Sequence, residues 1–188
     1  MKLIEILEQH RKHYIKHFIE CSKSCDGSNE VLLDQKSEDP FELYRLYRFD
    51  CLEKKEDGTY KIIEYNHDSY LKHPEISFTL NSMEIELIPI FWNGIEIDVF
   101  GFNGKWDKVH DWIVKWIDSN DTQEIEPIGS MSGLIHNFQR PEITTEKIKL
   151  AIDFGTANTI AMTELLNILQ ENDTYKIRIH SDTMLADE

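Results

Sequence analysis

The chain has 188 residues, of which 40% are hydrophobic and 29% are charged. This length and composition favour a single folded domain and exclude a disordered or membrane-embedded protein. The 35 acidic and 20 basic residues give a net charge of -15, which disfavours direct binding to nucleic acid because phosphates would be repelled.

Residues 2–24 are the first expected element, a helix in which apolar residues recur at helical spacing: Leu3, Leu7, Tyr14 and Phe18. Charges run through this segment, so it does not have the pattern of a signal peptide. No apolar run is long enough to cross a bilayer. We therefore expect a cytoplasmic protein that does not contact membranes, with reduced thiols at Cys21, Cys25 and Cys51.

Four residues of zinc-ligand type follow one another at intervals of four in this helix: His13, His17, Cys21 and Cys25. Each step rises ~6 Å along the helix, so the first and last lie ~18 Å apart. One tetrahedral ion could reach only a neighbouring pair, and it would need further ligands such as His67 or His73. We expect cysteines facing the core and histidines at its rim, with no metal and no other cofactor.

Strand patterns follow the helix. Residues 31–34 are a short strand or the end of a loop, after a stop at Gly27. Residues 43–66 predict a β-hairpin that turns at Asp57-Gly58, and residues 76–80 predict another strand.

Residues 83–102 predict a second hairpin around Asn93-Gly94, a strong hairpin signal. Pro89 cannot donate to a ladder, so an edge or a bulge is expected there. With a two-residue turn, one face would carry Leu87, Phe91, Glu96, Asp98 and Phe100. The other, purer apolar face would carry Ile88, Ile90, Ile97 and Val99.

Residues 106–118 predict a helix whose apolar stripe comprises Trp106, Val109, Ile113, Trp116 and Ile117. Trp112 lies to one side of this stripe, so it is either partly exposed or packed under the segment 119–140. Residues 118–146 predict a long loop with one short helical turn.

The C-terminal part predicts a βαβ unit, with a strand at 147–154, a helix at 158–171 and a strand at 174–181. The whole pattern predicts an α+β fold. It comprises a mostly antiparallel mixed sheet, an N-terminal helix, two further helices and the C-terminal βαβ unit. We expect one domain over residues 1–182 and a polar tail over residues 183–188.

The stretch IDFGTANT, residues 152–159, resembles the first phosphate loop of the actin-like and heat-shock-chaperone ATPases. In that family the motif opens the domain and a second strand follows it, whereas here a helix follows near the C-terminus. The P-loop and GxGxxG patterns are missing. We therefore interpret Gly155 as a strand-to-helix turn, with Thr156 or Asn158 capping the helix.

A partner-binding surface is expected on the second hairpin and the helix that follows it, at Phe91, Trp92, Glu96, Asp98 and Trp112. Acids beside large aromatic groups suit a basic protein, because the rings give contact area and the carboxylates steer association. The alternative is that a helix covers this face, leaving the acids at its margin.

The chain's general character is similar to that of bacterial toxin-immunity proteins, including those of contact-dependent inhibition and polymorphic toxin systems. They are small, acidic, often α+β and without catalytic motifs. The resemblance implies an intracellular inhibitor of a basic toxin domain, for example a nuclease. The alternative is a small cytosolic enzyme, possibly metal-assisted, although neither GxSxG nor HExxH occurs.

Overall fold

The computed structural model describes residues 2–36, 38–63, 71–120 and 131–181. The helices are α1 (Leu3–Ser24), α2 (Trp106–Ile117) and α3 (Thr159–Glu171), with a 3-10 turn at Glu42–Tyr44. The strands are β1 (Gly27–Asp34), β2 (Leu46–Lys54), β3 (Tyr60–Ile63), β4 (Ile76–Leu80), β5 (Met83–Leu87), β6 (Ile95–Phe100), β7 (Asn137–Phe138), β8 (Glu142–Ile143), β9 (Ile148–Asp153) and β10 (Lys176–His180). The predicted α+β class is confirmed.

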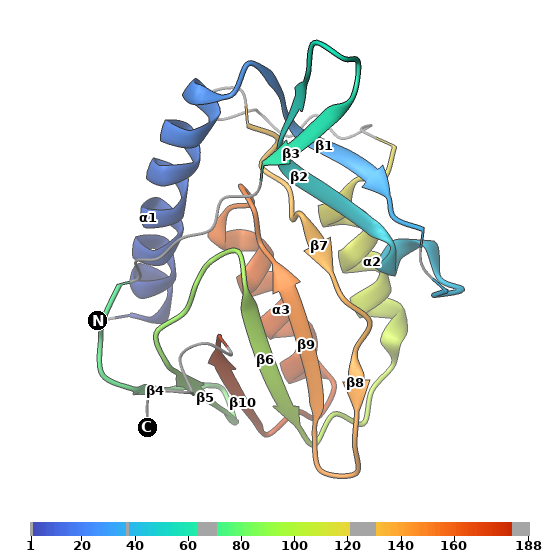
Figure 1. Ribbon diagram of the computed structural model, residues 1–188. Coiled ribbons are helices and arrows are strands. Elements are labelled where there is room, and N and C mark those ends of the chain that lie inside the picture. The colour runs from blue at the N-terminus through green and yellow to red at the C-terminus, as the bar shows by residue number, and fades with distance from the viewer. Residues whose placement is uncertain (1, 37, 64–70, 121–130, 182–188) are drawn as a thin grey trace.

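All ten strands belong to one sheet in the order β1-β2-β7-β9-β6-β10-β5-β4, with β3 paired to β2 and β8 paired to β9. Among the described strands the pairing is antiparallel, except between β10 and β5. In Figure 1, α2 and α3 pack behind the sheet, α1 stands along its left side, and the β2–β3 hairpin extends from the top.

One hydrophobic core joins the three helices to the inner face of the sheet. The predicted stripe of α2 is confirmed, since Val109, Ile113, Trp116 and Ile117 are all buried. In α1, Leu7, Tyr14 and Phe18 are buried as their spacing predicted. The strands alternate in the same way, and Met83, Ile85 and Leu87 of β5 are fully enclosed.

The first predicted hairpin is confirmed over residues 46–63, because Lys54 pairs with Tyr60 across the turn that contains Gly58, whereas Leu43 and Tyr44 belong to the 3-10 turn before β2. Residues 64–66 lie outside the described residues. Gly27 begins β1 instead of ending α1, whose C-cap is Cys25. A Cβ at position 27 would overlap the carbonyl of Leu52, so the close approach of β1 to β2 requires glycine here.

The second predicted hairpin is wrong. Strand β10 lies between β5 and β6, parallel to β5 and antiparallel to β6. A tight turn is present, with the Gly94 amide bonded to the Phe91 carbonyl at 3.0 Å, but β5 already ends at Leu87. Pro89 follows that end and cannot donate to a ladder, while β10 supplies buried Ile177 and Ile179 to both neighbours.

The change of pairing also alters the predicted faces. Ile97 and Val99 of β6 lie on the core face as expected, and Glu96 and Asp98 lie on the opposite face. Leu87 was assigned to the face of the acids, but it is buried on the core side. Strand β5 pairs with β10 and not with β6. Its core-facing side chains Ile85 and Leu87 therefore lie beside Ile177 and Ile179 of β10.

The C-terminal βαβ unit is present as β9, α3 and β10. Both strands run antiparallel to β6, which lies between them, so they are parallel to each other. In the described part of 118–146, β7 and β8 replace the predicted helical turn, because both pair with β9. Residues 121–130 and the predicted tail 183–188 lie outside the described residues. None of the described helices combines the length and apolarity needed to span a bilayer.

Candidate functional site

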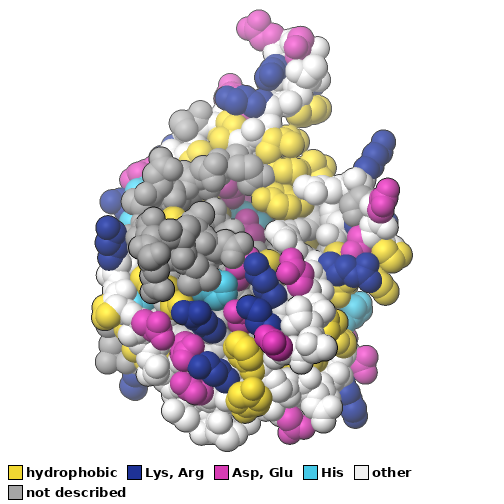
Figure 2. Space-filling model, turned by 60° about the horizontal axis from the view of Figure 1, so that its bottom comes forward, with side chains coloured by type: hydrophobic (Ala, Val, Ile, Leu, Met, Phe, Trp, Pro, Cys, Tyr) yellow, Lys and Arg dark blue, Asp and Glu magenta, His cyan; other side chains and the backbone are white. Residues whose placement is uncertain are grey.

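The outer face of the sheet carries a row of alternating charges across five strands. Strand pairing aligns the members of this row in the order Glu86, Arg178, Asp98, Lys149 and Glu142. Figure 2 shows described basic and acidic side chains interleaved over the lower half of its view instead of separating into patches of one sign. Opposite charges on neighbouring strands stabilise a sheet, so this face contributes to the fold.

Two of the predicted contact residues belong to this face. Lys149 Nζ lies 2.7 Å from Glu96 Oε1, and Lys147 Nζ lies 2.7 Å from Asp98 Oδ2. Buried His180 lies between the two acids, with ring nitrogens 3.6 Å from Glu96 and 3.5 Å from Asp98. Both acids are therefore largely neutralised by cations of neighbouring strands.

The aromatic members of the predicted set are placed differently. Trp92 is 2% exposed, stacks near Phe154, and donates its indole N–H to the Gly155 carbonyl at 3.1 Å. Trp112 is 3% exposed and donates to the Ala161 carbonyl at 2.9 Å. It is thus not exposed, because it packs on α3 and also lies edge-to-face against Phe138 of the segment 119–140. Phe91 is half-buried at the turn before β6. The structure does not bring the five residues together on one exposed surface.

An enclosed cluster of titratable groups centres on His136. Its Nε2 lies 3.0 Å from Glu30 Oε1. Its Nδ1 lies 3.2 Å from Asp50 Oδ1, an ion pair whose hydrogen-bond alignment is poor. Tyr14 donates its hydroxyl to Asp50 at 3.1 Å. The four residues come from α1, β1, β2 and the segment before β7, so the cluster joins distant parts of the chain.

Glu30 reaches this cluster through an irregular backbone. It has a φ of 52°, a left-handed conformation that is uncommon for glutamate, and it is skipped in the pairing of β1 with β2. Its carboxylate also accepts hydrogen bonds from the hydroxyls of Thr156 and Ser132 and from the Ser132 amide. The register of β1 on β2 is the same on both sides of Glu30, and its carboxylate lies in the interior, where its charge is fully hydrogen-bonded.

The stretch IDFGTANT forms the other wall of this cluster. Gly155 has a φ of 46°, and a Cβ there would overlap the His136 ring. The Asp153 carboxylate accepts the Gly155 amide at 2.7 Å, and Asn158 caps α3 by accepting the Ile160 amide at 2.9 Å. Arg11 donates to the carbonyls of Thr156 and Ala157. The predicted strand-to-helix turn and the Asn158 cap are confirmed, and the glycine also makes room for His136.

The ionisation of this cluster follows from its contacts. Burial opposes a charged imidazole, but the carboxylates of Asp50 and Glu30 outweigh it and raise the pKa of His136 to about 10. Burial also opposes a charged Glu30, yet its bonds with His136 and two hydroxyls lower its pKa. Burial and the charge of Asp50 raise the pKa of the Tyr14 phenol.

These pKa directions limit the chemistry of the cluster. A protonated His136 cannot accept a proton near neutral pH, and a carboxylate with a lowered pKa is a weak base. The side chains of His136, Glu30 and Asp50 are 0%, 4% and 5% exposed. The arrangement is suited to holding α1, β1 and β2 against the C-terminal unit rather than to proton transfer.

The residues of zinc-ligand type in α1 have other contacts. The rings of His13 and His17 meet at 4.8 Å between centroids, and His17 lies 3.7 Å from Glu20. His73 lies 3.1 Å from buried His10 and not beside His13. In the parts of the chain that the structure describes, no three His, Cys, Asp or Glu residues are grouped to hold a metal ion.

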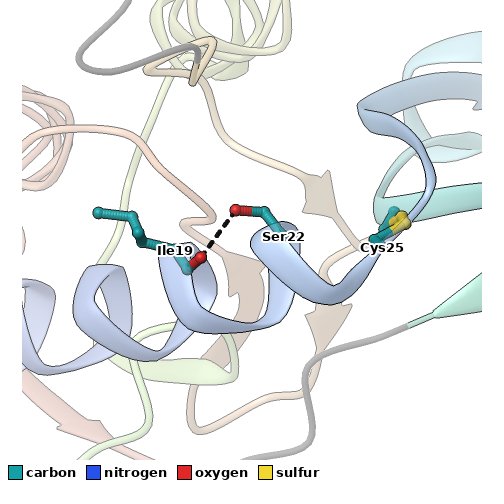
Figure 3. The surroundings of a disulfide bond; sticks show 4 residues. Ile19, Ser22 and Cys25 are labelled. Atoms are coloured by element: carbon teal, nitrogen blue, oxygen red, sulfur yellow. Dashed lines mark hydrogen bonds between the residues drawn. A yellow bond between two sulfur atoms is a disulfide. The ribbon is translucent and has the colours of Figure 1, made fainter.

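Cys25 and Cys51 form a disulfide, so the expectation of three reduced thiols is wrong. Cys51 lies opposite Asn29 in the β1–β2 pairing, and Cys25 comes just before β1, so the topology brings the two together. Figure 3 shows Cys25 after the last turn of α1, where the Ser22 hydroxyl donates to the Ile19 carbonyl at 3.0 Å. The bond fixes α1 to the two strands that carry Glu30 and Asp50.

No protein-family model matches this sequence, and no curated protein or solved structure is significantly similar to it.

Sequence reasoning missed the His136 cluster, because its members are far apart in the chain. The available signals were small. His136 interrupts an apolar run, and Glu30 lies at the start of one. Neither signal indicates the partner of the other residue, since pairing across 106 positions depends on the tertiary fold.

Proposed function

We propose that the protein is an acidic inhibitor that binds and neutralises a basic protein partner, in the manner of a bacterial immunity protein. The expected partner is a toxin domain, for example a nuclease. Binding would act by covering the active site or the substrate-binding face of that domain.

The observation that carries this proposal is where the surplus charge lies. Among the described acidic residues only Glu30, Asp50, Asp98 and Asp118 are buried. Among the described basic residues only Arg11 and Arg48 are buried, so the described surface carries more carboxylates than cations. A strongly negative surface accelerates association with a basic protein and repels nucleic acid.

The character of the enclosed cluster supports binding over catalysis. The cluster at His136 contains residues of catalytic type, but solvent does not reach them. A substrate would need access to such groups. Phe91, Glu96 and Asp98 stay predictions as contact residues, whereas Trp92 and Trp112 could affect binding only through the core that they fill.

The test is recovery of the partner from the protein's own host, using the tagged full chain at low and then at moderate salt. We expect one basic protein in near-stoichiometric amount, whose association rate falls as salt rises because electrostatic steering is screened. The wild type is compared with the double variant Glu56→Gln and Asp111→Asn. Both acids are exposed, so this variant has a smaller negative charge and an undisturbed described core.

Two results would contradict the proposal. One is an association rate that does not change with salt. The other is competition with DNA for many unrelated DNA-binding proteins, which would indicate a general nucleic-acid mimic instead of a specific inhibitor.

A further inference from the structure

Strand β4 ends the described sheet, and no other described strand pairs with its outer backbone edge. Among the described residues β4 pairs with β5 only, and a two-residue turn places Leu80 opposite Met83. Every second residue of β4, starting at Leu80, therefore exchanges backbone hydrogen bonds with β5. On the other side of β5, the Glu84 and Ile88 amides donate to the carbonyls of Tyr175 and Ile179, so Glu84 does not bond to Thr79 of β4, in agreement with this alternation. The N–H and C=O groups of Ser77 and Thr79 point outward, away from the sheet.

Strand β4 itself contains none of the residues that usually protect such an edge. The sequence of β4 is ISFTL, with no charge, proline or glycine. Soluble proteins normally block such edges with charged residues, prolines or bulges, because an open edge pairs with other strands. In Figure 1, β4 lies at the lower left beside the start of α1, at the end of the sheet.

An apolar groove of about 450 Å³ runs along one side of β4. Its apolar lining includes Leu3 and Ile4 at the start of α1, Phe78 and Leu80 of β4, Ile85 of β5 and Leu166 of α3. Ile4 is 54% exposed at its rim. A strand added beside β4 would direct every second side chain toward this groove.

The other face of β4 is bordered by acids. Thr79 pairs with Glu84 and Ser77 pairs with Glu86, and both acids belong to β5. With Glu75 they face two cations, Lys176 and Arg178, so one carboxylate is in excess. Ser77 and Thr79 have short side chains, so a lysine or arginine on an added strand could reach across them to these carboxylates.

We propose that β4 and its groove bind an extended strand of the protein partner, which continues the sheet. Its apolar side chains fill the groove, and its alternate Lys or Arg side chains face Glu84 and Glu86. This inference rests on the proposed function, and it names the site and the chemistry of the partner segment.

Charge selects this occupant over a second copy of the chain. Two copies joined edge to edge at β4 would place both sets of Glu75, Glu84 and Glu86 on one face of the shared sheet. Each copy also carries a net charge of -15. Like charges on neighbouring strands oppose pairing, whereas a basic strand is attracted.

The first test uses a capped synthetic peptide of alternating lysine and valine as the probe, titrated into the ¹⁵N-labelled full chain. We expect saturable amide shifts centred on Ser77 and Thr79. Thr79→Pro removes an outward N–H and keeps the bonds to β5, and edge strands tolerate proline. It should weaken binding at least tenfold, whereas Thr79→Ala, which keeps that N–H, should bind like the wild type. Unchanged spectra of the other residues check that both variants fold.

A second pair of variants tests the groove. Ile4→Lys puts a positive charge at its rim and should weaken peptide binding severalfold. Ile160→Lys is the matched control, because Ile160 is 56% exposed on α3 and does not line the groove.

Several results would overturn the inference: shifts centred elsewhere or not saturating, equal binding by the proline and alanine variants, or equal binding of a peptide with glutamate in place of lysine. A dimer seen by sedimentation that Thr79→Pro abolishes would assign the edge to a second copy and would also overturn it. If the basic protein recovered from the host binds Thr79→Pro as tightly as Thr79→Ala, the inference fails and the proposed function stands. Peptide binding at β4 without any basic partner in the host would instead contradict the proposed function.

Discussion

Gly155 shows how one residue determines the geometry of the His136 cluster. Its left-handed backbone costs about 1–2 kcal/mol for a residue with a side chain, and a Cβ would also overlap the His136 ring. We expect Gly155→Ala to lower the free energy of unfolding in urea by about 2–4 kcal/mol. Gly94→Ala is the control, because a Cβ there meets nothing within 4 Å. Equal losses in the two variants would contradict this role.

His136 predicts a loss of stability on the alkaline side. Below about pH 6.5, which is the usual pKa of histidine, the folded and the unfolded chain both carry the proton. The cluster then contributes fully to the free energy of unfolding. Because the folded pKa is raised to about 10, only the folded chain keeps the proton between these values. The free energy of unfolding should therefore fall as pH rises through this window, by at most about 1.4 kcal/mol per pH unit.

His10 gives the opposite sign on the acid side. Burial and the neighbouring His73 lower the pKa of His10 to about 4, so only the unfolded chain binds this proton between about pH 6.5 and that value. Stability from His10 is present above the window and is lost as pH falls through it. Nitrogen shifts of the two imidazoles check both statements. A neutral His136 at about pH 8 would contradict the account of its cluster.

At the scale of elements, the Cys25–Cys51 disulfide closes a loop of sequence separation 26 beside the strands that carry Glu30 and Asp50. A crosslink of this span stabilises a fold by about 3 kcal/mol, chiefly by restricting the unfolded chain. Reduction, or Cys25→Ser, should lower the free energy of unfolding by about that amount. Cys21→Ser is the control, since Cys21 does not belong to this disulfide. Three reactive thiols in the untreated protein would contradict the pairing.

The charge row across the sheet gives a second prediction at this scale. Arg178 lies between Glu86 and Asp98 on the neighbouring strands. Arg178→Glu would place three acids side by side and should cost about 1 kcal/mol, because the side chain is 36% exposed and solvent screens part of the repulsion. Arg178→Gln should cost less, and added salt should reduce the difference. A difference that persists at high salt would contradict an electrostatic origin.

The success of sequence reasoning about elements depended on how local the signal was. Helical stripes in α1 and α2, the Asp57-Gly58 hairpin and the βαβ unit all follow from neighbouring residues, and all are present. The Asn93-Gly94 hairpin failed because β10, about 80 residues later, occupies the place between β5 and β6. Turn chemistry indicates a reversal of the chain, but it does not exclude insertion of a distant strand.

At the scale of the whole molecule, the sequence determines the net charge, whereas it does not determine which residues are exposed. Net charge can be counted from the sequence without knowledge of the fold, whereas the exposure of a side chain depends on tertiary packing. Trp112 illustrates the difference, since its position beside the helical stripe is compatible with exposure or with packing, and the fold buries it against α3 and Phe138. The open edge at β4 was equally hidden from the sequence, because it depends on β4 being last in the sheet.

The central claim is that this protein binds a basic protein partner through its negative surface. The most direct measurement is the association rate of the recovered partner with the full chain, taken over a range of salt concentrations. The account predicts one partner and a rate that falls steeply as salt rises, since screening shortens the reach of surface charges. A partner that is not basic, or a rate that stays constant across the series, would contradict it.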